Sequence, residues 1–407
     1  MTVAMGAGSA KHAEVIVVGG GPVGLCLTNL LGEAGIDTML LEAGTVTATD
    51  LRASTFHPPT LEMLERLGLT DALIAKGMIC PTWQLRWHPS GERAVFDMSV
   101  LADETRYPYR LQCEQWKLSN LLTGQAGKRG NVSIRYSSPV VAVRQDDQSA
   151  EVDIETESGI ETLRASYVVG CDGVRGSVRK SAGLKLEGST YPGTTIIATT
   201  PFPFHEHLED ISVVSYCWSP GSHFSLLRVP AVWRVGLFPR ENVPLEDQLT
   251  PEAIEASLQE IVPNPKGYEV IEKRSYVVHM RIVPHYRNGR IVLAGDAAHI
   301  NSPSGGMGLN GGLHDAFSLA EQLTAILKDG APIERLDLYE RRRRPVAYDE
   351  ILMQSDRNRS RMRETDPVKR REIMDDMKAI TGDRARMKAY LLKSSMFEGV
   401  RRAAAID

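Results

Sequence analysis

Three glycines and one acidic residue near the amino terminus have the spacing of a nucleotide-binding site. The glycines are Gly19, Gly21 and Gly24 in VGGGPVGL, and Glu42 lies 18 residues beyond the last of them. Glycine permits a tight turn and close backbone approach to a pyrophosphate, and a helix that starts there attracts negative charge. The Glu42 carboxylate can accept hydrogen bonds from both ribose hydroxyls and would repel a 2′-phosphate. These residues predict a site for an adenosine diphosphate group.

The hydrophobic pattern predicts the elements that position these residues. Residues 15–18 form an apolar strand before the first glycine, and the leucine-rich segment 25–31 predicts a helix after it. A second apolar strand ends at Glu42. This order of strand, glycine turn, helix and strand is the βαβ unit of dinucleotide-binding proteins. The unit by itself fits either NAD or FAD.

A second group of glycines lies in the segment SPSGGMGLNGG, which begins at Ser302. It follows an apolar strand that ends at Gly295-Asp296, and it leads into an amphipathic helix. Another strand ends at Asp172-Gly173 and is followed by basic residues. Five glycines in eleven residues indicate a backbone that turns sharply or touches a ligand, although a flexible surface loop would also be rich in glycine.

The order of these three motifs resembles that of the group A flavoprotein monooxygenases, the family of para-hydroxybenzoate hydroxylase. The resemblance extends from about residue 14 to residue 345. It implies FAD as the cofactor and an α/β fold. The expected fold has a Rossmann-like FAD-binding domain of the para-hydroxybenzoate hydroxylase type, an inserted β-sheet substrate domain and C-terminal helices.

The resemblance implies that several side chains contact FAD. Arg52 and Gln115 would lie along the pyrophosphate and the ribityl chain. Asp296 would accept a hydrogen bond from a ribityl hydroxyl, and Asp172 would belong to the same cofactor site. Each of these residues could instead be an ordinary surface residue or a helix cap.

The resemblance also suggests a role for the glycine-rich segment. Gly308, Leu309 and Asn310 match the contacts of the family with the flavin edge, and Pro303 matches a proline whose carbonyl lies near the reacting ring position. Reduced isoalloxazine is anionic at this edge, and the free N–H groups of a helix start would stabilise that charge. The glycines would then let backbone donors reach the flavin.

The activity implied by the resemblance is an FAD-dependent monooxygenase that consumes NAD(P)H and O2. A flavin C4a-hydroperoxide would hydroxylate a small aromatic or heteroaromatic substrate of the phenol type, and the protein would supply orientation and a dry pocket. The one other GxGxxG match, Gly306 to Gly311, lies within the glycine-rich segment assigned to the flavin, so the nicotinamide donor has no Rossmann domain of its own and would dock transiently. Arg175 and Arg179 are candidates for binding its phosphates, or are solvated residues of a helix start.

Substrate contacts are expected in the segment 186–274, where short strands separated by proline and glycine predict a mixed or antiparallel sheet. In HFSLLRVP the period of two puts His223 and Arg228 on opposite faces, one of which should line the cavity. Both are candidates for binding or deprotonating a phenol, and we name them with Pro303 as the catalytic candidates. Further candidates are Tyr216, His57 and His285. No arginine clearly matches the family's carboxylate-binding residue, which argues against a benzoate-type substrate.

The composition excludes several other classes of protein. The 407 residues are 42% hydrophobic and 24% charged with a net charge of -4, which predicts a globular protein of two or three units and no nucleic-acid binding. No apolar stretch approaches the roughly 18 residues of a membrane span, and the start lacks a secretory signal, so we expect a cytoplasmic protein. The five cysteines lack CxxC spacing and His205 and His207 fit an exposed loop, so we expect no disulfide framework and no metal.

The chain is expected to alternate between two domains before a helical end. The expected segments are 1–75, 108–185 and 275–345 for the FAD-binding domain and 76–107 and 186–274 for the substrate domain. A helix should end at Pro345, and residues 346–407 should form a C-terminal helical region. Its methionines are expected to fill a core, and its surplus of basic residues to cover a solvated face.

Two other functions fit the same motifs. A flavin-dependent reductase of the geranylgeranyl reductase type would transfer hydride without inserting oxygen. A flavin-binding redox sensor would use FAD only to change conformation. The sequence leaves open the identity of the substrate, the preference between NADH and NADPH, and whether the chain forms a homodimer.

Overall fold

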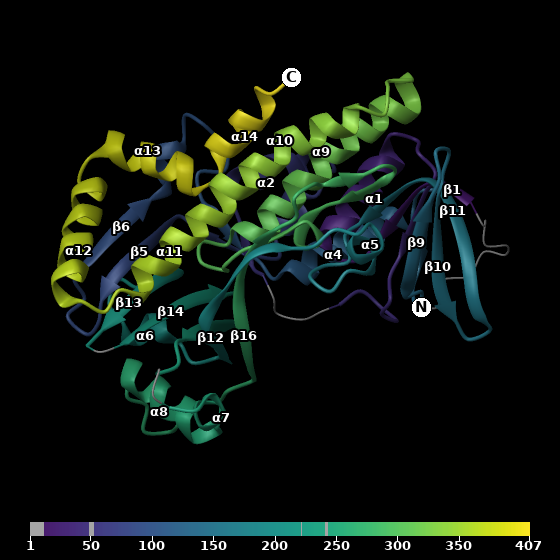
Figure 1. Ribbon diagram of the computed structural model, residues 1–407. Coiled ribbons are helices and arrows are strands. Elements are labelled where there is room, and N and C mark those ends of the chain that lie inside the picture. The colour runs from purple at the N-terminus through teal and green to yellow at the C-terminus, as the bar shows by residue number, and fades with distance from the viewer. Residues whose placement is uncertain (1–11, 49–52, 221, 241–242) are drawn as a thin grey trace.

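Two eight-stranded sheets form the frame of the protein in the computed structural model, which describes residues 12–48, 53–220, 222–240 and 243–407 (Figure 1). The first sheet contains β1 and β2 of the predicted βαβ unit, with β11 on the other side of β1; all three are parallel. The hairpin strands β9 and β10 extend this sheet from β11. Its strands are β1 (His12–Val18), β2 (Thr38–Leu41), β8 (Val132–Arg135), β9 (Val140–Gln145), β10 (Ala150–Thr156), β11 (Gly159–Gly170), β17 (Arg287–Asn288) and β18 (Ile291–Leu293).

Helices cover the parallel part of this sheet, and their packing explains its apolar strands. Helix α1 (Pro22–Glu33) lies between α4 (Gln115–Ala126) and α9 (Met307–Asp329). It is buried from Gly24 to Gly32 on all sides, because the sheet covers one side and helices cover the others. Strand β2 is likewise buried at every position, as expected for a parallel sheet with both faces covered.

The second sheet is mixed, as predicted for the segment 186–274. Its neighbours pair antiparallel except for the parallel pair of β13 with β5. Its strands are β5 (Thr82–Trp87), β6 (Arg93–Asp97), β12 (Glu187–Thr200), β13 (Val214–Ser219), β14 (Ser222–Val229), β15 (Val232–Leu237), β16 (Glu272–Ile282) and β19 (His299–Ile300). The expected boundary at residue 274 falls inside β16, and the domain boundaries remain a prediction.

The two faces of the second sheet pack against different elements, as the period of two predicts. Phe224 and Leu226 point into a core with Ile254 of α8 (Pro251–Ile261), which lies below the sheet with α7 (Leu245–Gln248) (Figure 1). Leu227 and Tyr216 lie on the opposite face, beside a cluster that includes residues of the C-terminal helices.

A small sheet lies between the two large ones. It consists of β3 (Thr55–Phe56), β7 (Arg110–Gln112) and β4 (Met78–Cys80). Thr55 packs against Gly306 before α9, whereas the Arg110 guanidinium lies over the Trp83 ring of the second sheet. The helices α2 (Pro58–Glu65) and α3 (Thr70–Ile74) follow β3 in the chain.

The C-terminal helices differ from the prediction at Pro345. This proline lies inside α10 (Arg335–Val346), and the chain continues through a π-helical segment, η3 (Ala347–Leu352), into α11 (Met353–Arg363). The prediction that the helix ends at Pro345 is therefore wrong. Proline lacks the N–H that an α-helix needs, and the wider π-turn re-forms the helical path directly after it.

Of the last helices, α12 (Pro367–Thr381) and α13 (Arg384–Ser394) pack against the second sheet at the end of the molecule opposite β9 and β10, and α14 (Phe397–Ala404) packs against α10 and α13 (Figure 1). Their methionines lie in a buried cluster with Trp83 and Phe96, which confirms that they fill a core; these are Met362 of α11 and Met374, Met377 and Met387.

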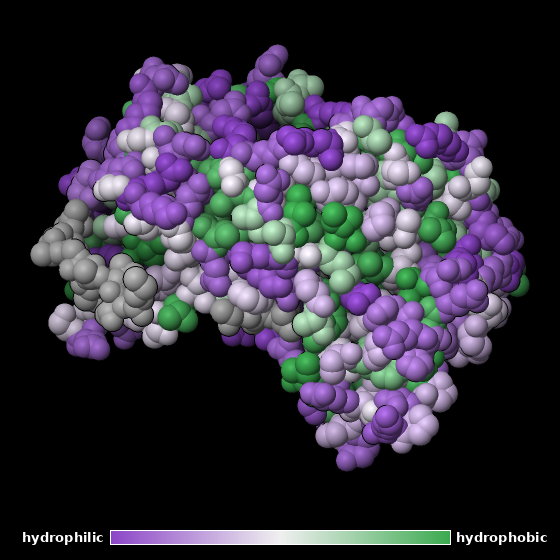
Figure 2. Space-filling view, turned by 180° about the vertical axis from the view of Figure 1, so that it is seen from behind, coloured by the Kyte–Doolittle hydropathy of each residue, from purple (hydrophilic) through white to green (hydrophobic). Residues whose placement is uncertain are grey.

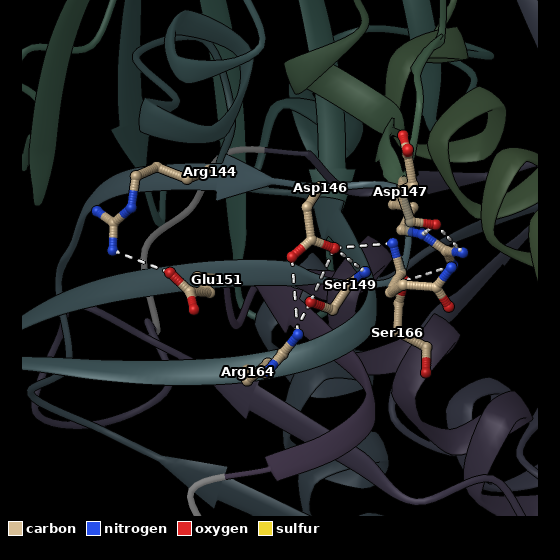
Figure 3. A network of polar contacts seen from close by, with 9 residues as sticks. Arg144, Asp146, Asp147, Ser149, Glu151, Arg164 and Ser166 are labelled. Atoms are coloured by element: carbon tan, nitrogen blue, oxygen red, sulfur yellow. Dashed lines mark hydrogen bonds and ion pairs between the residues drawn. The ribbon is translucent and has the colours of Figure 1, made fainter.

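The β9–β10 hairpin is held by a polar network far from these helices (Figure 3). Asp146 Oδ1 accepts hydrogen bonds from the N–H groups of Gln148 and Ser149, both at 2.7 Å, and Arg164 Nε donates to Ser149 Oγ at 2.8 Å. Arg290 Nη2 donates to the Asp147 carbonyl at 2.7 Å. Exposed pairs of this kind contribute little stability individually, so this network mainly fixes the local turn.

The face of the molecule opposite to the view of Figure 1 is mostly polar. Figure 2 shows polar side chains over most of the face opposite to Figure 1, with apolar ones interspersed across its centre. None of the helices in the described part of the chain has the length and apolar character needed to span a bilayer.

Candidate active site

Each of the three glycines in the first turn is needed for a different structural reason. Gly19 has φ of 109°, and a Cβ atom there would lie 2.5 Å from the Cys171 carbonyl oxygen. A Cβ at Gly24 would lie 2.0 Å from the Gly19 carbonyl oxygen, so this glycine lets α1 pack closely on the strand. A Cβ at Gly21 would meet nothing within 4 Å. The open side of the turn is therefore at Gly21, where a ligand can approach the backbone.

Glu42 lies beside this turn, just after β2. Its Oε2 accepts a hydrogen bond from the Gly20 N–H at 2.6 Å, and its Oε1 accepts one from the Gly44 N–H at 2.7 Å. A carboxylate has about four lone-pair positions, so two remain for a ribose. The two backbone donors fix the orientation of the carboxylate before any ligand binds.

Two helix starts provide free backbone donors. Helix α1 begins after Gly21 and α9 begins after Gly306, and neither has a side-chain cap or an acidic residue in its first turn. The first N–H groups of a helix have no partner within the helix, and its dipole favours negative charge there. One start fits a pyrophosphate and the other an anionic flavin edge, so the residues present fit an extended FAD.

The glycines of the segment 302–312 are required by packing as well. Gly305 and Gly306 have φ of 99° and 68°, which other residues rarely adopt. A Cβ atom at Gly306, Gly311 or Gly312 would lie 2.3–2.7 Å from a neighbouring side chain. The expectation that these glycines serve ligand contact is therefore incomplete, because they also allow α9 to approach its neighbours.

The residues predicted at the flavin edge lie at the start of α9. Gly308 and Leu309 are half-buried, and Asn310 is fully buried. The Asn310 side chain is used within the protein: its Oδ1 accepts from the His57 N–H at 2.8 Å, and its Nδ2 donates to the carbonyls of Thr55 and Gly306. Only the backbone of Asn310 can therefore serve a flavin.

Pro303 precedes this helix start and is exposed. Its carbonyl accepts a hydrogen bond from the Gly306 N–H at 3.0 Å. The predicted role of this carbonyl beside the flavin remains a prediction.

Asp172 and Arg179 fix the turn after β11. Asp172 Oδ2 accepts from the Val178 N–H at 3.0 Å at the start of α5 (Ser177–Ser181), and burial raises the pKa of Asp172. The buried Arg179 donates to the carbonyls of Gly173, Val174 and Ala297. Much of the hydrogen-bonding capacity of this guanidinium is therefore used within the protein, and a phosphate contact by Arg179 remains a prediction. Arg175 is exposed.

The remaining predicted cofactor residues lie at element ends. Asp296 is exposed in the 3₁₀ turn η2 (Gly295–Ala297), which packs against Val23 at the start of α1. Gln115 is half-buried as the first residue of α4. Arg52 lies outside the described residues.

A buried ionic cluster supports the η2 turn, and the sequence motifs did not indicate it. Asp315 of α9 accepts hydrogen bonds from Arg343 Nε and His299 Nε2, both at 2.7 Å, and from the Gly295 N–H at 3.1 Å. Burial would raise the pKa of Asp315, but the charges and hydrogen bonds of Arg343 and His299 lower it to about 2. The ionised Asp315 therefore ties α9, α10 and the η2 turn together.

A pocket opens beside the start of α9. Trp83, Leu85 and Tyr216 come from one face of the second sheet, and Gly305 comes from the glycine-rich segment. The full lining is Trp83, Leu85, Arg110, Tyr216, Gly305, Asn358, Arg361, Met362, Tyr390 and Ser394. Half of these residues belong to α11 and α13, for which the sequence pattern predicts only core packing and a solvated face.

The pocket walls are largely aromatic. The Trp83 ring stacks on Phe96 at 4.0 Å, and it contacts Tyr216 edge-on and Tyr390 at a tilt, each with 6.1 Å between ring centroids. Flat, apolar walls of this kind suit an aromatic ring.

Tyr216 and His57 are the proposed substrate candidates nearest to this pocket. Burial raises the pKa of Tyr216, whose oxygen accepts a hydrogen bond from the Gly305 N–H. His57 is fully buried behind the loop, with Nε2 2.9 Å from the Gly305 carbonyl oxygen. Burial lowers the pKa of His57 to about 3, so it is neutral near pH 7 and donates from Nε2.

The other candidates do not line the pocket. His223 is on the same sheet face, but it stacks on Phe238 at 4.0 Å, and burial and nearby arginines lower its pKa to about 3. Arg228 is on the opposite face, 5.8 Å from the Trp233 ring centroid. His285 is exposed and pairs with Glu340 at 3.0 Å. The structure therefore gives no support for a substrate contact by Arg228 or His285.

Comparison with known proteins defines the class of this chain. The family model described as FAD binding domain matches residues 12–355. The chain belongs to this family and is an FAD-dependent aromatic monooxygenase, which confirms the predicted fold, enzyme class and cofactor.

Particular relatives are similar in sequence over most of the chain. It is 35% identical to para-nitrophenol 4-monooxygenase of Pseudomonas sp. (strain WBC-3), over 95% of this chain and 96% of the relative. It is 34% identical to 6-hydroxy-3-succinoylpyridine 3-monooxygenase HspB of Pseudomonas putida (strain DSM 28022 / S16), over 81% and 84%. The crystal structure of p-nitrophenol 4-monooxygenase PnpA from Pseudomonas putida DLL-E4 superposes with a TM-score of 0.89 at 33% identity and covers 96% of this chain and 98% of that one.

Proposed function

We propose that this monooxygenase uses NAD(P)H and O2 to hydroxylate a small phenol or hydroxypyridine bound in the pocket lined by Trp83 and Tyr216. One observation carries the proposal: Gly305 lines the pocket and directly precedes the helix start that fits the flavin. A ring in the pocket would therefore lie next to the reacting end of the cofactor.

Residues at two ends of the site would hold the two halves of FAD. The first glycine turn and Glu42 would bind its adenosine half, and Asp296 and the start of α9 would bind its flavin half. Bound FAD accepts electrons from the nicotinamide and activates oxygen. The residues of this chain orient the cofactor and exclude water from the pocket.

The pocket residues orient the substrate ring. Trp83 and Tyr390 offer flat contact surfaces, while α11 and α13 close the side away from the sheet. Tyr216 accepts a hydrogen bond from the Gly305 N–H, which leaves its hydroxyl as a donor toward a substrate oxygen. The cavity thereby limits loss of activated oxygen to water.

The names of two relatives narrow the substrate class. Para-nitrophenol and 6-hydroxy-3-succinoylpyridine each carry a hydroxyl across the ring from an electron-withdrawing group. We extend this pattern to the present chain as a proposal. It is consistent with the small aromatic pocket.

The test is turnover of purified, FAD-loaded protein with a panel of phenols and hydroxypyridines. Under air with isotopic oxygen, we expect a substrate to accelerate NAD(P)H oxidation and one labelled oxygen atom to enter the product. Saturation of a double bond without air would favour the reductase instead. Bound FAD without turnover of any panel member would favour the redox sensor.

Two finer expectations belong with this proposal. All five cysteines are free, which fits a reducing cytoplasmic location. A homodimer is a prediction that light scattering of the purified protein would test.

A further inference from the structure

Arg110 is a buried cation that faces the pocket. It lies at the start of β7 with only 3% of its surface exposed, and it lines the pocket beside Trp83 and Tyr216. Its guanidinium carbon is 5.1 Å from the Trp83 ring centroid. Among the described residues it forms no ion pair or hydrogen bond that satisfies the guanidinium, and its Nε is buried without a partner.

A buried guanidinium normally has an anionic partner, because removing its charge from water is costly. The Trp83 ring compensates for part of that cost. The pocket lining contains two arginines and neither Asp nor Glu. The second arginine, Arg361, is half-buried and donates to the Tyr390 hydroxyl at 2.9 Å. The lining is therefore positively charged and lacks its own counter-ion.

We propose that Arg110 is the counter-ion of a negatively charged oxygen on the aromatic substrate, so that the pocket selects anionic rings over their neutral forms. The identity of the ligand as a substrate rests on the proposed function. The oxygen could be an ionised phenol hydroxyl or an acidic ring substituent. A planar guanidinium binds either through charge-assisted hydrogen bonds.

The test is binding to the FAD-loaded protein without NAD(P)H, measured by equilibrium dialysis. The first probe is 4-nitrophenol, whose hydroxyl ionises near neutral pH, so one molecule provides both charge states with the same shape. Wild-type protein should bind the anion more tightly than the neutral form. Arg110→Met should weaken binding of the anion by about 30-fold or more. It should leave binding of the neutral form nearly unchanged.

The second probe distinguishes the two sources of charge. With 4-hydroxybenzoate the carboxylate is ionised and the phenol neutral across the same pH range. If Arg110 pairs with an acidic substituent, the affinity of the protein for 4-hydroxybenzoate will depend on Arg110 and will not depend on pH. If Arg110 pairs with the phenol oxygen, only the affinity for 4-nitrophenol will depend on both Arg110 and pH. Either result supports the shared chemistry.

Matched variants control for structural effects. Arg371→Met removes another arginine that lies near a tryptophan ring, 6.0 Å from the Trp87 ring centroid and outside the pocket lining, and it should bind both probes like wild type. Arg110→Lys keeps the charge and should retain part of the selectivity even if Arg110→Met fails to fold. Flavin content and the unfolding midpoint identify a misfolded variant.

Equal affinity of wild type for the two forms of 4-nitrophenol, together with unchanged binding of 4-hydroxybenzoate by Arg110→Lys and Arg110→Met, would overturn the inference. Because binding is measured without turnover, this result is separate from a failure of the hydroxylation assay. Hydroxylation without charge selectivity would remove the role of Arg110 alone.

Discussion

Asp315→Asn should destabilise the protein far more than the loss of a surface charge. The substitution keeps the shape of the side chain but leaves Arg343, which is 2% exposed, without an anionic partner. Breaking a buried pair from one side costs about 3–5 kcal/mol. That is a large fraction of the roughly 5–15 kcal/mol by which proteins are stable.

The pKa of Asp315 gives a second magnitude for the same interaction. Its pKa is lowered from 3.8 to about 2, which corresponds to about 2 kcal/mol at 1.36 kcal/mol per pKa unit. This contribution is fully present above about pH 4 and is lost as the pH falls toward 2. The mutational cost should be larger, because the asparagine amide keeps one acceptor oxygen but places an NH2 group, which cannot accept, against either Arg343 Nε or His299 Nε2.

The assay is urea-induced unfolding at a fixed, saturating FAD concentration, because bound ligand shifts apparent stability. The control is Asp349→Asn, which breaks a surface ion pair with Arg402. The Arg402 side chain is 43% exposed and that of Asp349 is 44% exposed. This substitution should cost about 1 kcal/mol or less. Adding Arg343→Met to Asp315→Asn should restore part of the loss. The reasoning is refuted if Asp315→Asn costs no more than the surface control.

The remaining predictions concern the cofactor site and its supports. Gly24→Ala should destabilise the fold by about 1–3 kcal/mol because its Cβ would overlap a backbone oxygen, whereas Gly21→Ala should keep the unfolding midpoint and lose flavin; equal midpoints in thermal melts would contradict this contrast. Glu42→Arg should weaken FAD binding by about tenfold or more, since a charge-assisted acceptor is lost; unchanged flavin content after dialysis would remove Glu42 from the site. The pKa of His57 is lowered to about 3, so on acidification the unfolded state binds a proton at this residue before the folded state does. The free energy of unfolding should therefore fall from about pH 6.5 toward pH 3. His57→Gln should make this dependence on pH less steep in urea titrations.

The βαβ unit that carries the proposed adenosine site could be predicted from the sequence because local spacing determines it. The Gly21 turn and Glu42 belong to one βαβ unit, in which neighbouring residues in the chain are also neighbours in space. The alternation in β14 was equally local and gave the correct sheet faces.

The pocket could be predicted only in part. Asn358, Arg361 and Tyr390 reach it through packing of α11 and α13 onto strands β13 and β6, which lie more than a hundred residues earlier, and no local pattern encodes that contact. Arg110 lies in a short strand whose neighbours come from distant segments. The helix end expected at Pro345 was wrong for a related reason, since the π-turn that absorbs the proline is stabilised by its surroundings.

That π-turn joins α10 and α11 into one continuous helical segment, which extends from the proposed cofactor site to the proposed substrate pocket. Arg343 on α10 binds Asp315 below the proposed cofactor site, and Arg361 on α11 lines the proposed substrate pocket. Each helical residue advances this helical segment by about 100° of rotation. Inserting or deleting one residue in the segment 347–352 would therefore rotate a different set of side chains toward the substrate while Arg343 stays in place. Related enzymes could diverge in ring preference by this route without altering how they hold the flavin.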